Sequence, residues 1–332
     1  MNRRGALCAL LALAAAQRAS YAQQQGKVWR VGNLDAGSQP SASGPSGVWN
    51  AFVLQMQDLG YFEGKNLAIE SRYSDGHDER LPALAAELVR AKPDVIVTHN
   101  LLTTRAAQRA TSTIPIVFAA MTDPIVAGVV KSLARPEANV TGLSMMSVEI
   151  SSKHVELLAE TIKNLTRIAF LMAPARTSIS SHVSMLQSAQ AAAKRIGATV
   201  LPLEAGGADE IERAFVEAAG WHAEAMIVAA NPYFSREQRR IIQLALKQRL
   251  PTIFAFGYDA AAGGLMSYGQ DLRSFYRRAA ILVDKIFKGA KPGDLPIEQP
   301  TTFEFAVNLK TAKKLGIAIP PSVLLRADRV FE

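Results

Sequence analysis

The residues that could do chemistry in this sequence are small, polar or aromatic residues that directly follow apolar, strand-like runs. Their hydroxyl, amide and carboxylate groups can hydrogen-bond a small molecule, and their rings can stack on one. The candidate binding residues are Asp35, Ala36, Ser38, Thr98, His99, Asn100, Asp123, Ser144, Asn231, Tyr233, Gly257, Tyr258 and Tyr268. At any one position a plain turn or helix cap is the alternative interpretation, as for Asp123 before Pro124.

Motifs for phosphate binding and for covalent catalysis are missing. The loop within residues 28–52 lacks both the G-x-G-x-x-G spacing and the Gly-Lys-Ser/Thr of a P-loop, and Pro40 and Pro45 would remove backbone donors from a phosphate cradle. The sequence has no G-x-S-x-G, and its five histidines lack metal-ligand spacing. The acidic stretch at residues 74–80 is interpreted as a turn followed by helix-start acids rather than a metal site.

From these missing motifs we predict no catalytic residue, no cofactor and no metal. The loop within residues 28–52 is interpreted as one wall of a reversible solute site, because it offers hydroxyls and free N–H groups at the start of a helix. A plain flexible connection between strand and helix is the alternative.

The elements that could bring the candidate residues together follow from an alternation along the chain. Apolar runs of strand length alternate with helix-period segments from residue 28 to residue 143, and a second series of the same kind follows. Such alternation predicts parallel sheets, which bind ligands at the carboxyl ends of their strands. We therefore predict an α/β fold with two doubly wound parallel-sheet lobes, joined by a hinge and separated by a cleft.

The lobe boundaries are predicted from the places where this rhythm changes. The first lobe is predicted to cover residues 26–143 plus about 265–295, and the second residues 144–264 plus about 296–332, with hinge crossings near 141–147, 257–270 and 290–303. A short helix is predicted over residues 125–133. The alternating residues 301–309 predict a half-exposed strand at a sheet edge or hinge.

The N-terminal segment has the pattern of a secretory signal. Paired arginines precede an apolar run over residues 5–16 that is too short to span a bilayer, and Ser20 and Ala22 fit a small-residue cleavage site. Residues 1–22 are therefore predicted to be a signal peptide cleaved near Ala22, which places the mature chain in the periplasm. Ordinary secretion is favoured over twin-arginine export, because the context NRRGALC lacks most of that signal.

The formal net charge of +8 indicates a modest basic excess, since three arginines belong to the N-terminal segment. The other Lys and Arg residues lie mostly on helix-period segments among acids, rather than in one block with interleaved aromatic residues. We therefore predict no nucleic-acid partner. The single cysteine, Cys8, lies in the predicted signal, so the exported chain is expected to contain no thiol.

Three long segments carry a resemblance to a known family: DLGYFEGKNLAIESRYSDGHDERLPALAAELVRAKPDVIVT, TIPIVFAAMTDPIVAGVVKSLARPEANVTGLS and DLPIEQPTTFEFAVNLKTAKKLGIAIPPSVLLRADRVFE. Over residues 28–332 the chain resembles the bacterial ABC-transporter substrate-binding proteins of the TrpX-like kind, which have a type I periplasmic-binding-protein fold. Glu137 and Ala138 stand where the family usually has Gly-Gly, a surface-turn change that should leave binding unaffected.

The resemblance implies an exported, monomeric receptor that is not an enzyme. Such a receptor closes two lobes on a small-molecule solute and delivers it to an ABC permease in the inner membrane. The implied solute is an amino acid, aromatic ones included, or a related small organic molecule. For an amino acid, Ser38, Ser144 and Thr98 are assigned to the carboxylate, Asp123 to the ammonium, and Tyr233, Tyr258 or Tyr268 to stacking.

Two other classes of protein stay open. A sugar-repressor-like ligand sensor shares the two-lobe core, but it would need an N-terminal helix-turn-helix where this chain has an export signal. A secreted enzyme that uses the cleft would need a carboxylate pair, such as Asp35 with Asp123, to lie close together.

Overall fold

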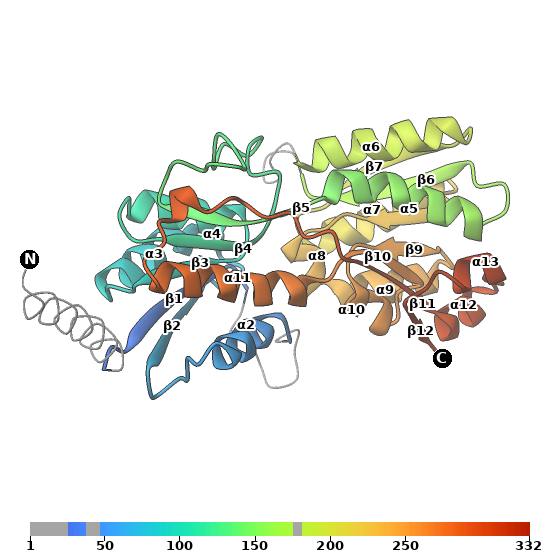
Figure 1. Ribbon diagram of the computed structural model, residues 1–332. Coiled ribbons are helices and arrows are strands. Elements are labelled where there is room, and N and C mark those ends of the chain that lie inside the picture. Colours follow the sequence, from blue (N-terminus) through green and yellow to red (C-terminus); the bar gives the residue numbers. More distant parts are fainter. Residues whose placement is uncertain (1–25, 38–46, 175–180) are drawn as a thin grey trace, which may run out of the picture.

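The first lobe is a parallel sheet with helices on both faces (Figure 1). The computed structural model describes residues 26–37, 47–174 and 181–332, and the strands in these ranges form two sheets. The five-stranded sheet has the order β2-β1-β3-β4-β5, and each neighbouring pair is parallel. Its strands are β1 (Trp29–Asp35), β2 (Leu67–Tyr73), β3 (Val95–Thr98), β4 (Ile116–Thr122) and β5 (Val140–Met145).

Apolar stripes on the helices of this lobe form two cores, one on each face of the sheet. Helices α2 (Gly47–Asp58) and α11 (Leu272–Phe287) pack on one face, where Phe52, Val97 and Phe275 are fully buried. Helices α3 (Leu81–Arg90) and α4 (Leu101–Ala110) cover the other face. Short 3-10 turns, η1 (Asp78–Arg80) and η2 (Pro292–Asp294), complete the lobe.

The short helix predicted over residues 125–133 is wrong. This segment, all of it described, forms turns in which the N–H groups of Val129 and Val130 both donate to the carbonyl of Pro124. Gly128 has a φ of 66°, which a right-handed helix cannot accommodate. The helix-period pattern is therefore interrupted by the glycine.

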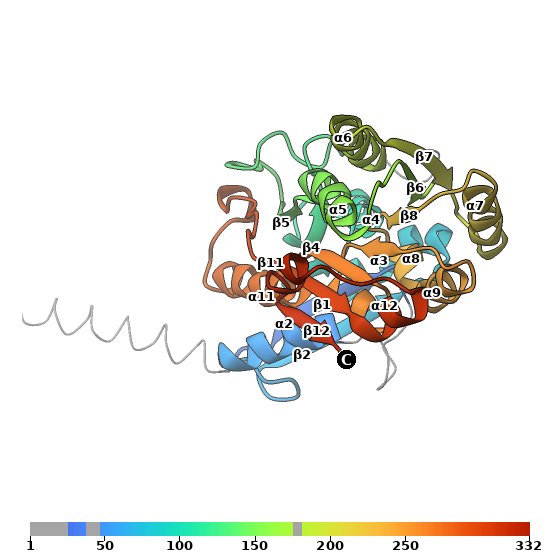
Figure 2. The same cartoon turned by 90° about the vertical axis from the view of Figure 1, so that its right-hand side faces the viewer.

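The second lobe has a seven-stranded sheet in the order β12-β11-β10-β9-β8-β6-β7. Its strands are β6 (Arg167–Met172), β7 (Thr199–Glu204), β8 (Ala225–Val228), β9 (Thr252–Phe254), β10 (Met266–Gln270), β11 (Phe303–Asn308) and β12 (Arg329–Phe331). Its helices are α5 (Ser147–Thr161), α6 (Ser181–Arg195), α7 (Ala208–Gly220), α8 (Pro232–Arg236), α9 (Gln238–Lys247), α10 (Gly257–Ala261), α12 (Leu309–Leu315) and α13 (Pro321–Leu324). Figure 2 shows α5 and α6 on one side of this sheet and α7 and α9 on the other.

One predicted lobe boundary is corrected by the strand pairing. The sequence predicts that residues 265–270 belong to the first lobe, but β10 pairs with β9 in parallel and with β11 in antiparallel fashion, so it belongs to the second sheet. The second sheet is therefore mixed rather than wholly parallel. The chain returns to the first lobe only after Gln270, where α11 begins.

Within the described ranges the chain passes between the lobes at residues 145–147, 270–272 and 298–303 (Figure 1). The side chain of Gln270, which is 2% exposed, joins all three passages. Its Oε1 accepts from the N–H of Met146 at 2.8 Å, and its Nε2 donates to the carbonyl of Pro300. Gln270 is therefore the central residue of the hinge. No helix in the described ranges is long and apolar enough to cross a membrane.

Candidate functional site

Interactions across the boundary between the lobes show where their strand ends meet. Gly76, just after β2, faces the guanidinium of Arg236, which ends α8 in the other lobe. The two are so close that a Cβ atom added to Gly76 would lie 3.5 Å from this guanidinium. Burial raises the pKa of Asp78, and the charge of Arg236 opposes this shift. Burial also raises the pKa of Tyr276 on α11, and the charges of Asp35 and Tyr258 add to this effect. The carboxyl ends of β1, β2, β8 and β9 therefore face one shared region.

The first lobe contributes a chain of hydrogen bonds centred on His99, directly after β3. The ring Nε2 lies 2.6 Å from Oδ1 of Asn33, and Nδ1 is bonded to the hydroxyl of Tyr276. The Nδ2 of Asn33 donates to the hydroxyls of Ser71, at 3.1 Å, and Tyr73, at 3.4 Å. Both ring nitrogens of His99 are thus engaged, so His99 offers a ligand its ring rather than a free nitrogen.

Asp35, at the end of β1, places a carboxylate beside this chain. Its Oδ2 lies 3.8 Å from Nε2 of His99, and its side chain is 29% exposed. Its Oδ1 accepts from the N–H of Gly37 at 2.8 Å, which fixes the orientation of the carboxylate. Burial lowers the pKa of His99, and the nearby Asp35 opposes this shift only in part, so the imidazole is neutral at neutral pH.

The second lobe contributes a half-buried polar cluster built on α8, α9 and α10. The hydroxyl of Tyr258 lies 3.1 Å from that of Ser235, and Nε2 of Gln238 donates to Oδ1 of Asp259 at 2.5 Å. Burial raises the pKa of Tyr258, whose ring stacks on Phe256 with centroids 5.3 Å apart. Burial also raises the pKa of Asp259 to about 7. A cavity of about 10 Å³ lies between Ser235 and Asp259, at the carboxyl ends of β8 and β9.

We call this region the interlobe site. It consists of Asp35, His99 and Tyr276 from the first lobe and Ser235 and Tyr258 from the second. It combines hydrogen-bonding oxygens and aromatic rings with a hinge that lies beside it, and its described residues include no nucleophile paired with a free base. Such an arrangement can hold a small polar molecule between the lobes without making or breaking a bond.

Several candidate residues use their polar side-chain atoms within their own lobe. The Oδ1 of Asn100 accepts from the N–H of Thr103 at 3.1 Å, and Oδ1 of Asp123 accepts from that of Val126 at 3.0 Å. The hydroxyl of Thr98 is bonded to a buried threonine of α4 at 2.7 Å. Such caps are the alternative interpretation that the sequence had left open.

The remaining candidates lie around the same strand ends or away from them. Asn231 caps α8 through Oδ1, which accepts from the N–H of Tyr233 at 2.7 Å. Tyr268 lies in β10, where its ring stacks on Phe303 with centroids 5.7 Å apart. Ala36 follows β1 and accepts from the N–H of Gly76, Ser144 lies in β5 and donates its N–H to Glu298, and Gly257 begins α10. Ser38 lies outside the described residues.

Sequence reasoning missed Tyr276 and Ser235 of the interlobe site, and it missed Asn33, which holds His99 of that site. Asn33 lies inside β1, where a buried polar residue in an apolar run was the available signal. Tyr276 lies inside α11, where an aromatic residue on a buried helix face looks like any core residue. Ser235 belongs to the short helix α8 and carried no signal.

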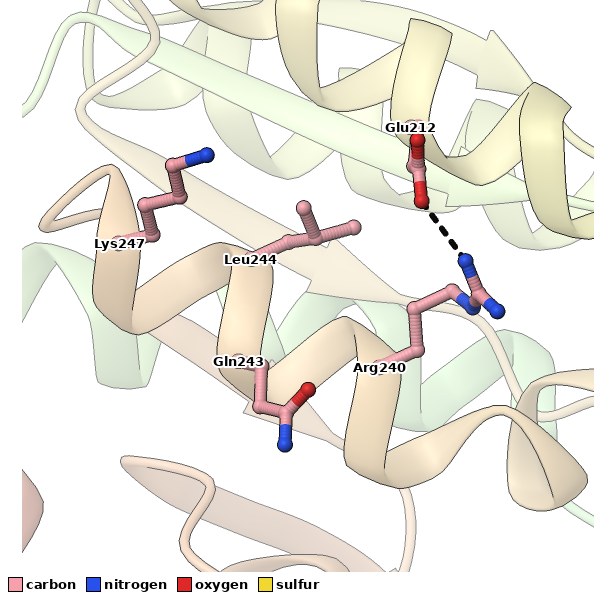
Figure 3. A pocket seen from close by; sticks show the side chains of 5 residues that line it. All are labelled: Glu212, Arg240, Gln243, Leu244 and Lys247. Carbon is pink, nitrogen blue, oxygen red and sulfur yellow. Dashed lines mark hydrogen bonds and ion pairs between the residues drawn. The ribbon is translucent and has the colours of Figure 1, made fainter.

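A larger surface pocket lies elsewhere, between α7 and α9 (Figure 3). It has a volume of about 360 Å³ and is lined by Glu212, Arg240, Gln243, Leu244 and Lys247. Arg240 and Glu212 pair across it at 2.7 Å. None of the candidate residues lines this pocket, so it is distinct from the interlobe site. Among the described residues, no group of three or more His, Cys, Asp or Glu side chains could hold a metal ion.

Two doubly wound lobes with polar strand ends at their boundary are the architecture of the type I periplasmic-binding-protein fold. The chain belongs to the family of ABC transporter substrate binding proteins, whose model matches residues 46–331. This result confirms the predicted family and fold, and the members to which the chain is similar are binding proteins rather than enzymes.

Three proteins illustrate the likeness. A tyrosine-binding protein of Clostridioides difficile is 25% identical over 267 residues, which cover 80% of this chain and 75% of that protein. The crystal structure of a conserved domain protein from Vibrio cholerae is 28% identical with a TM-score of 0.84, covering 92% of this chain and 100% of that one. An ABC domain from Streptococcus pneumonia in complex with L-Trp is 25% identical with a TM-score of 0.82, covering 91% and 99%.

Proposed function

We propose that this chain is the exported receptor of an ABC importer and that it binds an aromatic α-amino acid between its lobes. The observation that carries the proposal is the joint likeness to a tyrosine-binding protein and to an L-Trp complex over most of the chain. The interlobe site supplies suitable groups: a carboxylate for the ammonium, hydroxyls for the polar end and tyrosine rings for the side chain.

Asp35 is the group that we assign to the ligand ammonium. Its carboxylate is partly exposed at the lobe boundary beside His99, whereas Asp123 already caps the turn that follows β4. The earlier assignment of Asp123 is therefore replaced in this proposal. Because each charge-assisted hydrogen bond contributes about 1.5–3 kcal/mol, loss of this carboxylate should weaken amino-acid binding about 10- to 100-fold.

Calorimetric titration of the purified protein with L-tryptophan, L-tyrosine, L-leucine and a sugar alcohol tests the proposal. We expect the aromatic amino acids to bind most tightly. Asp35→Asn should weaken their binding, while Asp58→Asn, a matched change at the exposed end of α2, should not. The amino-acid proposal fails if none of the amino acids binds, and the assignment of Asp35 fails if both variants bind like the wild type.

Hinge closure, export and delivery to a permease belong to the same proposal. Closure predicts that saturating ligand decreases the radius of gyration measured by small-angle scattering, and an unchanged radius contradicts it. Export predicts that the mature protein isolated from the periplasm begins near Gln23, as N-terminal sequencing would show. The proposed partner is an ABC permease of the inner membrane, and the receptor is proposed to act as a monomer.

A further inference from the structure

The hydrogen bonds around His99 have a defined direction, which begins at Asn33. Asn33 is 1% exposed, and its Nδ2 group is used to donate to Ser71 and Tyr73. Its Oδ1 can only accept, and this atom lies 2.6 Å from Nε2 of His99. With the Asn33 amide in this orientation, Nε2 donates to Oδ1 and carries the proton.

The same direction continues through the imidazole to Tyr276. A neutral imidazole that is protonated at Nε2 has no proton at Nδ1, so Nδ1 accepts from the hydroxyl of Tyr276. The hydroxyl proton of Tyr276 is thereby used. What remains on this oxygen is acceptor capacity, and within the described ranges no second partner uses it.

The position of Tyr276 turns this acceptor into a feature of the binding site. Tyr276 lies in the second turn of α11, which starts at the hinge, and its side chain belongs to the first lobe. Its hydroxyl is bonded to Nδ1 of His99, and the carboxylate of Asp35 lies 3.8 Å from Nε2 of the same ring. The charges of Asp35 and of Tyr258 from the opposite lobe both act on Tyr276. The oxygen and the carboxylate of Asp35 therefore lie at the two nitrogens of one imidazole, at the boundary that a ligand would occupy.

We propose that Tyr276 is a specificity-determining residue whose hydroxyl oxygen accepts a hydrogen bond from the ligand ammonium next to Asp35. This inference rests on the proposed function, because it names the second group that would recognise the amino end of an amino acid. A ligand with a keto oxygen at that position would place an acceptor against two acceptors. The site would therefore select α-amino acids over the corresponding α-keto acids, because the keto oxygen would have no hydrogen-bond donor.

The tautomer of His99 tests the direction of the chain without any ligand. Long-range proton–nitrogen NMR spectra of the full chain with labelled histidine distinguish the two neutral tautomers, and the spectrum of His99→Gln assigns the signal. We expect His99 to be protonated at Nε2. Protonation at Nδ1 would reverse the chain and overturn the proposal, because Tyr276 would then be free to donate.

Calorimetry with L-tryptophan and indole-3-pyruvate tests the role of Tyr276 in selection. Tyr276→Phe should weaken L-tryptophan binding about tenfold, which is about 1.4 kcal/mol, and should narrow its advantage over indole-3-pyruvate. Tyr61→Phe is the matched control, because it removes a tyrosine hydroxyl that donates to Asp284 on the same helix α11, at 2.9 Å. The role of Tyr276 is refuted if Tyr276→Phe binds L-tryptophan with an affinity within about twofold of that of Tyr61→Phe.

The two proposals fail in different ways. If wild-type protein binds neither L-tryptophan nor L-tyrosine, the proposed function is wrong, and the Nε2 tautomer still decides whether Tyr276 presents an acceptor. If wild-type protein binds them and Tyr276→Phe does so equally well, only the role of Tyr276 is wrong. Thermal unfolding of both tyrosine variants identifies a folding defect, in which case the tautomer measurement on wild-type protein alone supports or overturns the inference.

Discussion

Replacement of Gln270 by methionine tests whether one side chain holds the three passages between the lobes together. Methionine keeps the length and flexibility of glutamine but cannot form its two hydrogen bonds. The change leaves the N–H of Met146 and the carbonyl of Pro300 without their partner. Both residues are half-buried, so each loss should cost about 1–2 kcal/mol, and the variant should lose about 2–4 kcal/mol of unfolding free energy.

Urea unfolding followed by circular dichroism measures this change. The matched control is Gln248→Met at the end of α9, because the Oε1 of Gln248 is buried without a partner in the described structure. The control should therefore change stability by less than about 0.5 kcal/mol. If both variants lose the same free energy, the loss reflects the amide in general, and the role of Gln270 in the hinge is refuted.

Two further predictions concern pH and backbone packing. Asp259 has a pKa of about 7 in the folded protein, whereas an unperturbed aspartate has a pKa of 3.8. The free energy of unfolding should therefore fall by up to about 4 kcal/mol as the pH rises from about 4 towards 7. Buried His154 has a pKa of about 4, whereas an unperturbed histidine has a pKa of 6.5. The stabilisation that neutral His154 provides is therefore lost as the pH falls from about 6.5 to about 4. Relative to the wild type, the stability of Asp259→Asn should therefore change upward between pH 4 and pH 7 and that of His154→Gln should change downward. Urea-unfolding profiles that run parallel to the wild type would contradict this. Gly269→Ala should lower the midpoint of urea unfolding sharply, because the new Cβ would overlap the carbonyl of Ala255. The control Gly220→Ala adds a Cβ that meets nothing within 4 Å, so it should raise or preserve the midpoint. Equal midpoints for the two variants would contradict the steric argument.

The sheets were largely predictable from the sequence because buried parallel strands are continuous apolar runs. Val95–Thr98 and Ala225–Val228 show this pattern and are entirely buried in the two lobes. The lobe to which β10 belongs was not predictable, since its residues would suit either core and only pairing with β9 and β11 decides. The helix predicted over residues 125–133 was wrong for a local reason, because a periodic pattern does not reveal that a glycine has a positive φ.

The candidate site was predictable where polar residues end strands and hidden where they lie inside elements. Asp35 ends β1, His99 and Tyr258 come after β3 and β9, and the structure brings the three residues to one boundary. Asn33 and Tyr276 complete the hydrogen-bond chain, but they lie within a strand and a helix whose patterns indicate only a core. His99 and its partner Tyr276 are 177 residues apart in the sequence, so only the tertiary structure shows that they are bonded.

The placement of α11 has a consequence for how this molecule can be made. The helix covers the first sheet, yet it follows every parallel strand of the second lobe up to β10 in the chain. A growing polypeptide that has just completed β5 therefore has α2 on this face of its sheet but lacks α11 until more than a hundred further residues have emerged. We expect the N-terminal half expressed alone to aggregate, and co-expression of a fragment that begins before Leu272 to restore a soluble complex.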